Sequence, residues 1–409
     1  MKAPLRFYIV DDNEAVASTA RMILEHAGHE VATCTSSREA LQTIPRWRPD
    51  CVLLDLMMPE LDGLELCRKL RETPGLEELK IIICSGKAFT YDRQRALDVG
   101  ADGYIVKPLR VDTFTAQVTK VIRDEVEVRF WGVRGTLPRA GAGSVRYGGN
   151  TSCVSLRFPR GQYVIFDAGT GIKWLGDHLL AGGDKRITGK LFLSHPHWDH
   201  INAIPFFTPL YIPGNDFEIL GPSQGELSIR QQVAAQMEGV YFPITMREFG
   251  ANVYFRDLQV GTYTIGRIQV QTMLLSHPGY CLGYRLHYRN RSLCYVTDNE
   301  LFLPGSDFYA EEYAERLLDF VAGTDLLITD ATYTDEEYHA RVGWGHSCVS
   351  QVVHLAARAN VKTLYLFHHD PGQDDQAIDR KLATAQALLA ERAAHITCYA
   401  PAEGQLVMI

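Results

Sequence analysis

The chain has 409 residues, enough for two or three domains that each bury a core. Its formal net charge of -8 argues against broad binding to nucleic acids or anionic membranes, and its nine cysteines form no CxxC pair, as is typical of reduced cytoplasmic proteins. Met1–Pro4 does not begin a signal peptide, and no stretch reaches the ~18 apolar residues of a membrane span, so we expect a cytoplasmic protein that does not enter the membrane.

Residues 1–123 alternate short apolar runs with helical patterns, in which apolar residues recur at three- and four-residue spacings. This repeated βα pattern predicts a parallel sheet flanked by helices. Acidic residues, a hydroxyl and a lysine stand where the apolar runs end, namely Asp11, Asp12, Asp55, Ser85 and Lys107. Because the carboxyl ends of parallel strands meet at one edge of a sheet, these side chains are expected to form an acidic pocket there.

The pattern resembles the receiver domain of bacterial response regulators, a flavodoxin-like (βα)5 fold. The resemblance implies that Asp55 accepts a phosphoryl group from a sensor histidine kinase or another phosphodonor. It also implies that Asp11 and Asp12 help to hold Mg²⁺, a hard cation that prefers oxygen ligands. The residues that match the hydroxyl, the lysine and the switch aromatic of the family are Ser85, Lys107 and Tyr104. A flavodoxin-like fold with an ordinary acidic rim is the alternative.

A helix is predicted over residues 111–125, where apolar residues fall on one face. A strand-like run over residues 126–131 follows almost directly, and no Gly/Ser-rich or Pro-rich linker separates the two. We therefore expect two domains without a flexible linker, at residues 1–123 and 127–409.

The second domain contains the run Ser194-His195-Pro196-His197-Trp198-Asp199-His200 directly after an apolar stretch. On an extended chain His195 and His197 point the same way, because side chains alternate, while Asp199 and His200 fall on the next turn. Further residues of metal-binding types follow later apolar runs, namely His277, Asp298 and His368. Side chains at the ends of buried strands are aimed by the sheet, so this set predicts a site for two metal ions.

The motif HxHxDH followed by His, Asp and His resembles the metallo-β-lactamase fold superfamily, over roughly residues 127–409. The resemblance implies an αββα sandwich that holds two ions. Its implied ligands are His195, His197 and His277 for the first ion, Asp199, His200 and His368 for the second, and Asp298 as a bridging, catalytic residue. Asp167 would orient the histidine loop without touching the metal. His369, next to His368, is the alternative ligand.

Imidazole at His197 favours zinc, whereas flavodiiron oxygen reductases usually carry glutamate there. Two Zn²⁺ ions are expected, with Mn²⁺ or Fe²⁺ as the alternatives. The segments around Asp330 and Gly345-His346-Ser347 resemble the phosphodiesterase branch, which includes tRNA 3′-processing nucleases and cyclic phosphodiesterases. The resemblance implies that His346 is a catalytic acid oriented by Asp330. In the alternative reading, Ser347 caps the following helix and His346 is only its neighbour.

The segments Phe130–Gly135 and Arg146–Cys153 resemble the N-terminal sequence of the branch containing phosphoribosyl 1,2-cyclic phosphodiesterase. Arg134 and Asn150 would then touch the substrate phosphate or line the site, unless these glycine-rich segments only form tight turns. Residues 215–260 intervene between the metal motifs and could cover the site or contact a second subunit.

Together the two halves indicate a response regulator with an enzymatic output. Phosphorylation at Asp55 would adjust hydrolysis of a small phosphodiester, such as a cyclic nucleotide or a cyclic ribose phosphate. One alternative is hydrolysis of a carbon ester or lactone on the same scaffold, and another is a metal-containing module that binds without catalysis. A homodimer is expected, and DNA binding is not, since no helix-turn-helix pattern is apparent.

Overall fold

The computed structural model describes residues 4–76, 78–159, 161–182, 186–302 and 305–409, which divide into two compact units. The first unit ends at Val126 and takes in Phe158–Gln162. The second consists of Glu127–Arg157 and Tyr163–Ile409. Among the described residues, no helix combines the length and the apolar character that crossing a membrane requires.

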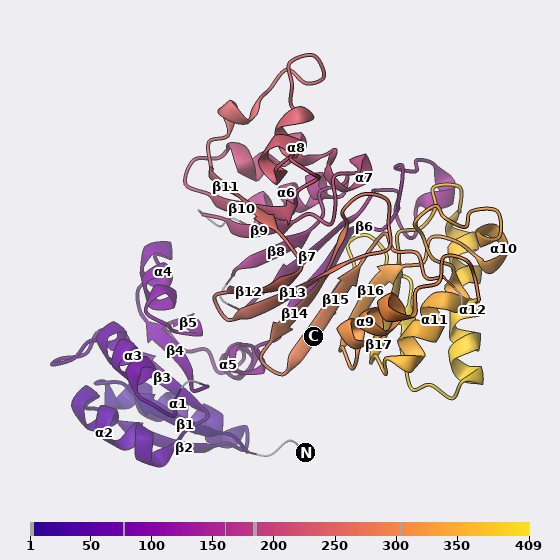
Figure 1. Ribbon diagram of the computed structural model, residues 1–409. Helices are drawn as coiled ribbons and strands as arrows, with labels where there is room; N and C mark the ends of the chain where they lie inside the picture. The colour runs from indigo at the N-terminus through magenta and orange to yellow at the C-terminus, as the bar shows by residue number, and fades with distance from the viewer. Residues whose placement is uncertain (1–3, 77, 160, 183–185, 303–304) are drawn as a thin grey trace. The chain divides into compact units, whose positions relative to one another are not determined.

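The first unit is a parallel five-stranded sheet with the strand order β2-β1-β3-β4-β5 (Figure 1). In chain order its elements are β1 Arg6–Val10, α1 Glu14–His26, β2 Glu30–Cys34, α2 Ser37–Trp47, β3 Cys51–Asp55, α3 Gly63–Glu72, β4 Lys80–Ser85, α4 Thr90–Asp98, β5 Gly103–Val106 and α5 Phe114–Arg123. The helices α1 and α5 cover one face of the sheet, and α2, α3 and α4 contribute to the core on the other face. The flavodoxin-like (βα)5 prediction is confirmed.

The local sequence fixes where α3 begins relative to Asp55. The side chain of Asp62 caps the helix by accepting a hydrogen bond from the amide of Glu65 at 2.8 Å. A Cβ atom at Gly63 would lie 2.1 Å from the carbonyl oxygen of Asp55, so only glycine allows this approach. The start of α3 is therefore packed against the end of β3, next to Asp55.

The second unit contains two seven-stranded sheets (Figure 1). The first sheet has the order β11-β10-β9-β8-β7-β6-β19, with β6 Glu127–Gly132, β7 Cys153–Arg157, β8 Tyr163–Phe166, β9 Thr188–Phe192, β10 Asp216–Pro222, β11 Asn252–Leu258 and β19 Leu406–Met408. The second has the order β12-β13-β14-β15-β16-β17-β18, with β12 Gly261–Ile265, β13 Ile268–Leu274, β14 Leu282–Tyr288, β15 Arg291–Val296, β16 Leu326–Asp330, β17 Thr363–Phe367 and β18 Thr397–Tyr399.

Helices cover the outer face of each sheet in the second unit (Figure 1). The α-helices are α6 Ile172–Ala181, α7 Trp198–Ile201, α8 Ile229–Ala235, α9 Glu311–Val321, α10 Asp335–Tyr338, α11 Val349–Arg358 and α12 Asp375–Glu391. Short 3-10 turns lie at η1 Ala142–Ser144, η2 Ile204–Phe206, η3 Thr208–Tyr211 and η4 Met246–Glu248. The helices α6 and α8 share a core with the first sheet, and α9, α11 and α12 share one with the second. The predicted αββα sandwich is confirmed.

Aromatic side chains fill the space between the two sheets. The ring of Phe166 on β8 stacks on that of Tyr295 on β15, with centroids 4.8 Å apart, and packs 5.6 Å from Tyr284 on β14. The buried hydroxyls find partners in the loops that follow β8 and β9. Tyr295 donates to Asp167 at 2.7 Å, and Tyr284 donates to the carbonyl oxygen of Leu193 at 2.6 Å. The middle layer of the sandwich therefore also anchors the loops that carry the polar residues.

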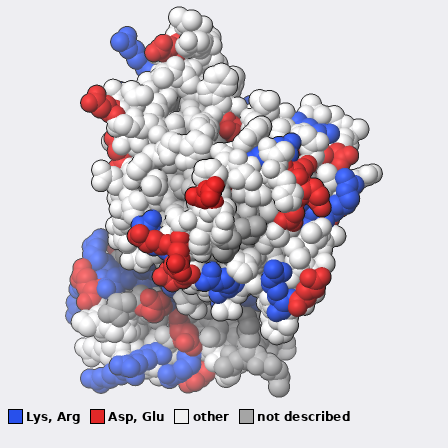
Figure 2. Space-filling view, turned by 45° about the vertical axis from the view of Figure 1, so that its right-hand side comes forward, with Lys and Arg blue, Asp and Glu red and all other residues white. Residues whose placement is uncertain are grey.

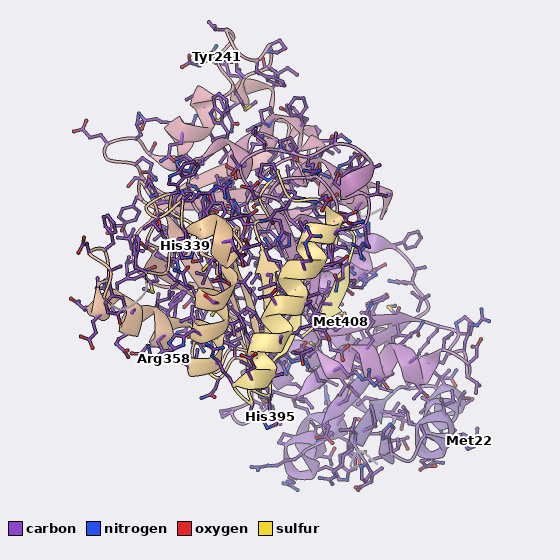
Figure 3. The ribbon with its side chains drawn as sticks, turned by 90° about the vertical axis from the view of Figure 1, so that its right-hand side faces the viewer. Met22, Tyr241, His339, Arg358, His395 and Met408 are labelled. Atoms are coloured by element: carbon purple, nitrogen blue, oxygen red, sulfur yellow. The ribbon has the colours of Figure 1, made fainter. Side chains whose placement is uncertain are left out.

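The segment that the sequence places between the metal motifs forms β10, α8, η4 and β11. Tyr241 lies between α8 and η4, is 77% exposed, and projects outward at the end of a protruding loop (Figure 3). The suggested role of this segment in covering the site stays a prediction.

Among the described residues on the face in Figure 2, acidic and basic side chains are intermingled and form no continuous basic surface.

Candidate metal centre

The residues of the predicted metal site follow strands of both sheets in the second unit. His195 lies in the loop after β9, and His197 is the N-cap of α7, so Asp199 and His200 occupy the first turn of that helix. From the second sheet come the residues that follow β13, β15 and β17, which are His277, Asp298 and His368. Two sheets packed against each other thus bring together ligand types from distant parts of the sequence.

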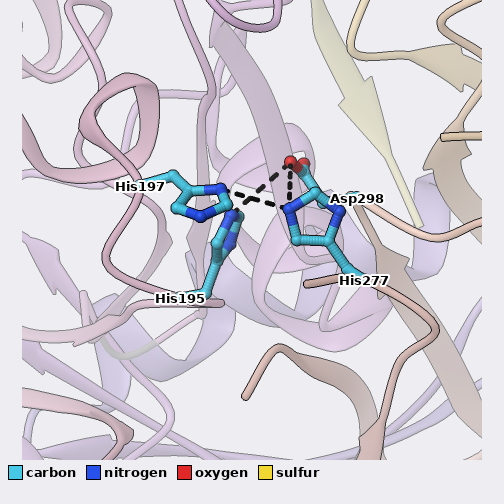
Figure 4. Close-up of side chains that lie close together, drawn as sticks. All are labelled: His195, His197, His277 and Asp298. Atoms are coloured by element: carbon cyan, nitrogen blue, oxygen red, sulfur yellow. Dashed lines mark hydrogen bonds and ion pairs between the residues drawn. The ribbon is translucent and has the colours of Figure 1, made fainter. Parts of the chain in front are cut away.

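A first group consists of His195, His197, His277 and Asp298, whose potential ligand atoms all lie within 4.8 Å of one another (Figure 4). The Nε2 atom of His277 is 3.1 Å from Nδ1 of His197. Oδ2 of Asp298 lies 3.6 Å from Nε2 of His195 and 3.7 Å from Nε2 of His277. The solvent reaches this group at His197, whereas His195 and Asp298 are buried.

A second, wholly buried group consists of Asp199, His200, His368 and again Asp298. The Nε2 atoms of His200 and His368 lie 3.2 Å and 3.1 Å from Oδ1 of Asp298. They lie equally close to Oδ2 of Asp199, at 3.2 Å and 3.1 Å. Asp298 therefore directs one oxygen to each group.

Hydrogen bonds on the far side of the rings leave a nitrogen of each ring facing the groups. Nδ1 of His277 donates to the carbonyl oxygen of Gly345 at 2.9 Å, and Nδ1 of His200 donates to Asp167 at 2.8 Å. Nδ1 of His368 lies 3.1 Å from Oγ1 of Thr332. A proton held on the outer nitrogen leaves the inner nitrogen as a lone-pair donor, as metal-binding histidines require.

The donor set fits divalent metal ions. Within the described part of the chain, Nε2 of His195 and Nε2 of His200 are buried without a hydrogen-bond partner. Buried polar atoms are normally paired, so two such nitrogens aimed at one carboxylate call for a further partner. A set of imidazoles and carboxylates suits Zn²⁺, and binding would satisfy both orphaned nitrogens.

The charges at the centre favour a cation. Burial alone would raise the pKa of Asp298, but His200, His368 and His195 hold it well below its usual value. Burial lowers the pKa of His195 well below its usual value, and the neighbouring His200 lowers it further. Burial also disfavours charge on His200, yet Asp199, Asp298 and Asp167 raise its pKa well above the usual value. The carboxylates thus attract positive charge to the point where the two groups meet.

Asp167 holds the histidine loop from behind. This fully buried carboxylate accepts hydrogen bonds from the amide and the hydroxyl of Ser194, at 2.7 Å and 3.0 Å. It also accepts the hydrogen bonds from His200 and Tyr295 described above. Four donors on one carboxylate fix both the strand end and the His200 ring, and the role of Asp167 in positioning a metal-binding loop stays a prediction.

His346 and Asp330 lie at the edge of the second group. Nδ1 of His346 is 2.7 Å from Oδ2 of Asp330, and the His346 ring stacks on the His368 ring with centroids 4.9 Å apart. Burial disfavours the charged ring, but the charge and the hydrogen bond of Asp330 raise the pKa of His346 to about 9. Asp330 is itself fixed by the amides of Asn299 and Thr332. This arrangement can hold a proton beside His368.

The alternative in which Ser347 caps the following helix is wrong. Cys348 is the N-cap of α11, and its amide is bonded to Gln351 at 3.0 Å. The hydroxyl of Ser347 instead donates to the carbonyl oxygen of Asn299 and accepts from the amide of Leu301. Ser347 therefore ties the loop that carries His346 to the loop that carries Asp298.

The structure does not bring Arg134 and Asn150 to the metal groups as substrate contacts. Arg134 is completely buried, and its guanidinium donates to the carbonyl oxygens of Gly148 and Gln373. The side-chain amide of Asn150 donates to Glu403 at 2.7 Å. Both side chains are committed to holding loops together, because the glycine-rich segments fold back on the protein interior.

His369 is turned away from its neighbour His368. It belongs to none of the candidate groups found among the described residues, and its buried ring lies 6.4 Å from that of Tyr147. The left-handed backbone of His368, with φ of 58°, separates the directions of the two rings. The geometry therefore favours His368 over His369 as a ligand.

Three further residues support the site and were not singled out from the sequence. The amide of Thr136 donates to Oδ2 of Asp199 at 2.7 Å, and Thr332 contacts His368 as described. Buried Glu300 accepts hydrogen bonds from the amides of Gly343 and Gly345, both at 2.7 Å. The sequence signal that could have identified Glu300 is an acidic residue only two positions after Asp298, beyond the end of a buried strand.

In the first unit the predicted acidic pocket is present. Asp11, Asp12 and Asp55 lie with their carboxylate oxygens within 4.8 Å of one another. Nζ of Lys107 is 2.7 Å from Asp11 and is also hydrogen-bonded to Asp55. Burial raises the pKa of Asp55, although the Lys107 hydrogen bond and charge oppose the shift. Three oxygen donors of this kind suit a hard cation such as Mg²⁺.

Two further receiver residues lie near the end of β4. Ser85 is buried, and its hydroxyl accepts a hydrogen bond from the amide of Lys87 at 3.1 Å. The hydroxyl of Tyr104 donates to the carbonyl oxygen of Lys87 at 2.8 Å. Both residues therefore contact the same short segment, which follows β4 at the pocket edge.

Comparisons with known proteins agree with the two units. Response regulator MprA of Mycolicibacterium vanbaalenii is 40% identical over 120 residues, which make up 29% of this chain and 51% of that protein. MprA of Mycobacterium leprae is 38% identical over 119 residues, again 29% of this chain and 51% of the relative. The chain thus spans about half the length of the curated relatives it matches.

A solved structure resembles the second unit. The metallo-beta-lactamase fold protein YhfI from Bacillus subtilis superimposes with a TM-score of 0.51, covers 70% of this chain and 100% of its own, and is 16% identical in sequence. At that identity the likeness concerns the fold alone. Residues 7–119 match the response regulator receiver domain, and residues 162–369, about half of the chain, match the beta-lactamase superfamily domain. The chain therefore belongs to the beta-lactamase superfamily and carries a response regulator receiver domain at its N-terminal end.

Proposed function

We propose that this protein is a response regulator whose output is hydrolysis of a small phosphodiester, such as a cyclic nucleotide or a cyclic ribose phosphate. In this proposal residues 1–123 form the receiver domain, and residues 127–409 form a hydrolase that binds two divalent metal ions, most simply Zn²⁺. A receiver domain implies a phosphodonor, for which a sensor histidine kinase is the expected partner. Asp55 would be the phosphorylated residue, with Asp11 and Asp12 as Mg²⁺ ligands.

One observation carries the enzymatic part of the proposal. Two overlapping groups of potential metal-binding residues share Asp298, and His346 and Asp330, which form a further such group with Asp298 and His368, lie against the second. A binding module needs neither two ion sites nor a histidine whose outer nitrogen is held by a buried carboxylate. Hydrolysis of a phosphodiester uses all of these parts.

The ligands of the first ion would be His195, His197 and His277, and those of the second ion Asp199, His200 and His368, with Asp298 shared. Such ions, when bound, activate water at neutral pH and offset the negative charge that develops on phosphorus. Asp167 keeps His200 in one orientation and thereby preserves the geometry of the second group.

His346 supplies the proton that the leaving oxygen needs. Its Nδ1 is occupied by Asp330, so the ring presents Nε2 as the group that can give up a proton. The stacking of His346 on His368 keeps this nitrogen next to the second group. An alkoxide leaving group would otherwise depart as a strong base, and protonation removes that cost.

Release of product from a substrate panel tests the proposal. The panel contains cyclic mononucleotides, cyclic dinucleotides, ribose cyclic phosphate and a lactone, and the protein is used after its metal content has been measured. We expect EDTA-sensitive cleavage of at least one phosphodiester, which a His277→Ala variant should not catalyse. Turnover of the lactone without any phosphodiester would point to acyl chemistry, and no turnover by metal-loaded protein would point to a binding module.

A further inference from the structure

Two tryptophans are exposed next to the candidate metal centre, although this residue type is usually largely buried. Trp198 directly follows His197 and is 81% exposed. Trp344 directly precedes Gly345 and is 60% exposed. Large apolar side chains that remain in solvent beside a functional site indicate a contact with something that binds there.

Each tryptophan is the chain neighbour of a residue that belongs to the first group or contacts it. His197 lies 3.1 Å from His277, and His277 donates to the carbonyl oxygen of Gly345. These contacts run from His197 through His277 to Gly345. Trp198 follows the first of these residues in the sequence, and Trp344 precedes the last. His197 is also the ligand-type residue of the first group that is exposed. The first group is therefore open to solvent at His197, beside Trp198.

Both tryptophans are attached to backbone that is held firmly. Trp198 is the first residue of α7, between two proposed ligands, His197 and Asp199. Trp344 lies between two glycines whose amides both donate to the buried carboxylate of Glu300, at 2.7 Å each. The same carboxylate accepts from the hydroxyl of Tyr338 at 2.8 Å. Little backbone entropy would be lost when a ligand packs on these rings.

We propose that Trp198 and Trp344 form a stacking site for a nucleobase, which makes the substrate of the metal centre a nucleotide rather than a base-free ribose phosphate. This inference rests on the proposed function, because it assumes that the phosphate binds at the metal groups. Flat aromatic faces bind bases of any sequence by stacking, and their contribution is large when the rings are held in place. A base-free sugar phosphate would leave both rings in water.

Binding can be measured separately from turnover. Calorimetry on zinc-loaded full-length protein would compare the four nucleoside 5′-monophosphates with ribose 5-phosphate. We expect at least one nucleotide to bind more tightly than ribose 5-phosphate, and Trp198→Ala or Trp344→Ala to weaken it by about 10-fold each. The Phe variants at these positions should retain most of the affinity. Trp174→Ala is the matched control, since Trp174 is 54% exposed on α6.

Equal binding of ribose 5-phosphate and the nucleotides would overturn the inference, as would full nucleotide affinity in both alanine variants. A change in oligomeric state of the alanine variants with unchanged nucleotide affinity would instead assign the two rings to a subunit contact, which also overturns it. Turnover of a cyclic nucleotide and of its base-free methyl riboside analogue separates the two proposals. Base-dependent binding without turnover would retain the stacking site and reject the hydrolase, whereas equal turnover of both compounds would retain the hydrolase and reject the stacking site.

Discussion

The hydrogen bond between His346 and Asp330 assigns different tasks to the two ring nitrogens of one histidine. We expect His346→Gln to lower kcat by roughly 100-fold or more, because glutamine cannot protonate a leaving group. Metal content should stay at the wild-type level, since the two groups around Asp298 remain complete. Steady-state kinetics with metal analysis on the same sample would check this. Wild-type kcat at full metal content would contradict the role of His346 as an acid.

Lys381 on α12 is buried with its Nζ donating to the carbonyl oxygens of Ala331 and Thr332, at 2.6 Å and 3.1 Å. Burial lowers its pKa from 10.5 to about 7. The unfolded chain therefore binds this proton more readily than the folded protein between these two values. Protonation of Lys381 therefore lowers the free energy of unfolding by its full amount below about pH 7, and this effect disappears as the pH rises toward 10.5.

A Lys381→Met variant tests this linkage. The free energy of unfolding of the variant minus that of wild type should be most favourable to the variant at low pH. The difference should shift in favour of wild type as the pH rises, because the destabilisation from Lys381 then disappears. The expected change is a few kcal/mol, since one unit of pKa corresponds to about 1.4 kcal/mol. Urea denaturation of both proteins at about pH 6 and about pH 9.5 measures the difference. A gap that does not depend on pH would show that Lys381 is not the titrating group.

At the scale of elements, the turn Gly343–Gly345 sets the position of His277. Both glycines have positive φ, 87° and 85°, but a Cβ at Gly345 would lie 2.3 Å from Nδ1 of His277, whereas a Cβ at Gly343 meets nothing within 4 Å. We expect Gly345→Ala to lower metal content and activity strongly. Gly343→Ala, which carries only the backbone strain of roughly 1 kcal/mol, should leave both nearly unchanged. Similar losses in the two variants would show that strain, and not the position of His277, matters.

The elements also show what a sequence can predict and what it cannot. His277, Asp298 and His368 were recognisable because each stands within three residues of the end of a strand, where the sheet fixes its direction. Glu300 and Thr136 lie in loops, whose course depends on contacts with distant segments. Arg134 illustrates the same limit, since the resemblance of its segment to a phosphodiesterase branch suggested that it contacts the substrate phosphate or lines the site. The structure folds that loop inward, and the guanidinium binds main-chain carbonyls instead.

At the scale of the whole molecule, the receiver domain is expected to control the hydrolase through Asp55. Phosphorylation should change turnover by about 5-fold or more if the coupling between the two sites is of ordinary size. Activity measured before and after treatment with acetyl phosphate, with phosphorylation verified on the same sample, checks this. An Asp55→Asn variant should not respond to the treatment. Identical rates for phosphorylated and untreated wild type would reject enzymatic control by the receiver domain.

The carboxylate of Asp298 belongs to both proposed ion sites. A substitution at Asp298 would alter both proposed ion sites together, because it removes an oxygen from each. The aromatic layer around Phe166 and Tyr295 does not include Asp298, so the sandwich keeps its own support. One nucleotide change could therefore turn such an enzyme into a folded protein without hydrolytic activity. In this architecture, a single substitution at the shared carboxylate is expected to remove hydrolytic activity while the αββα sandwich stays folded.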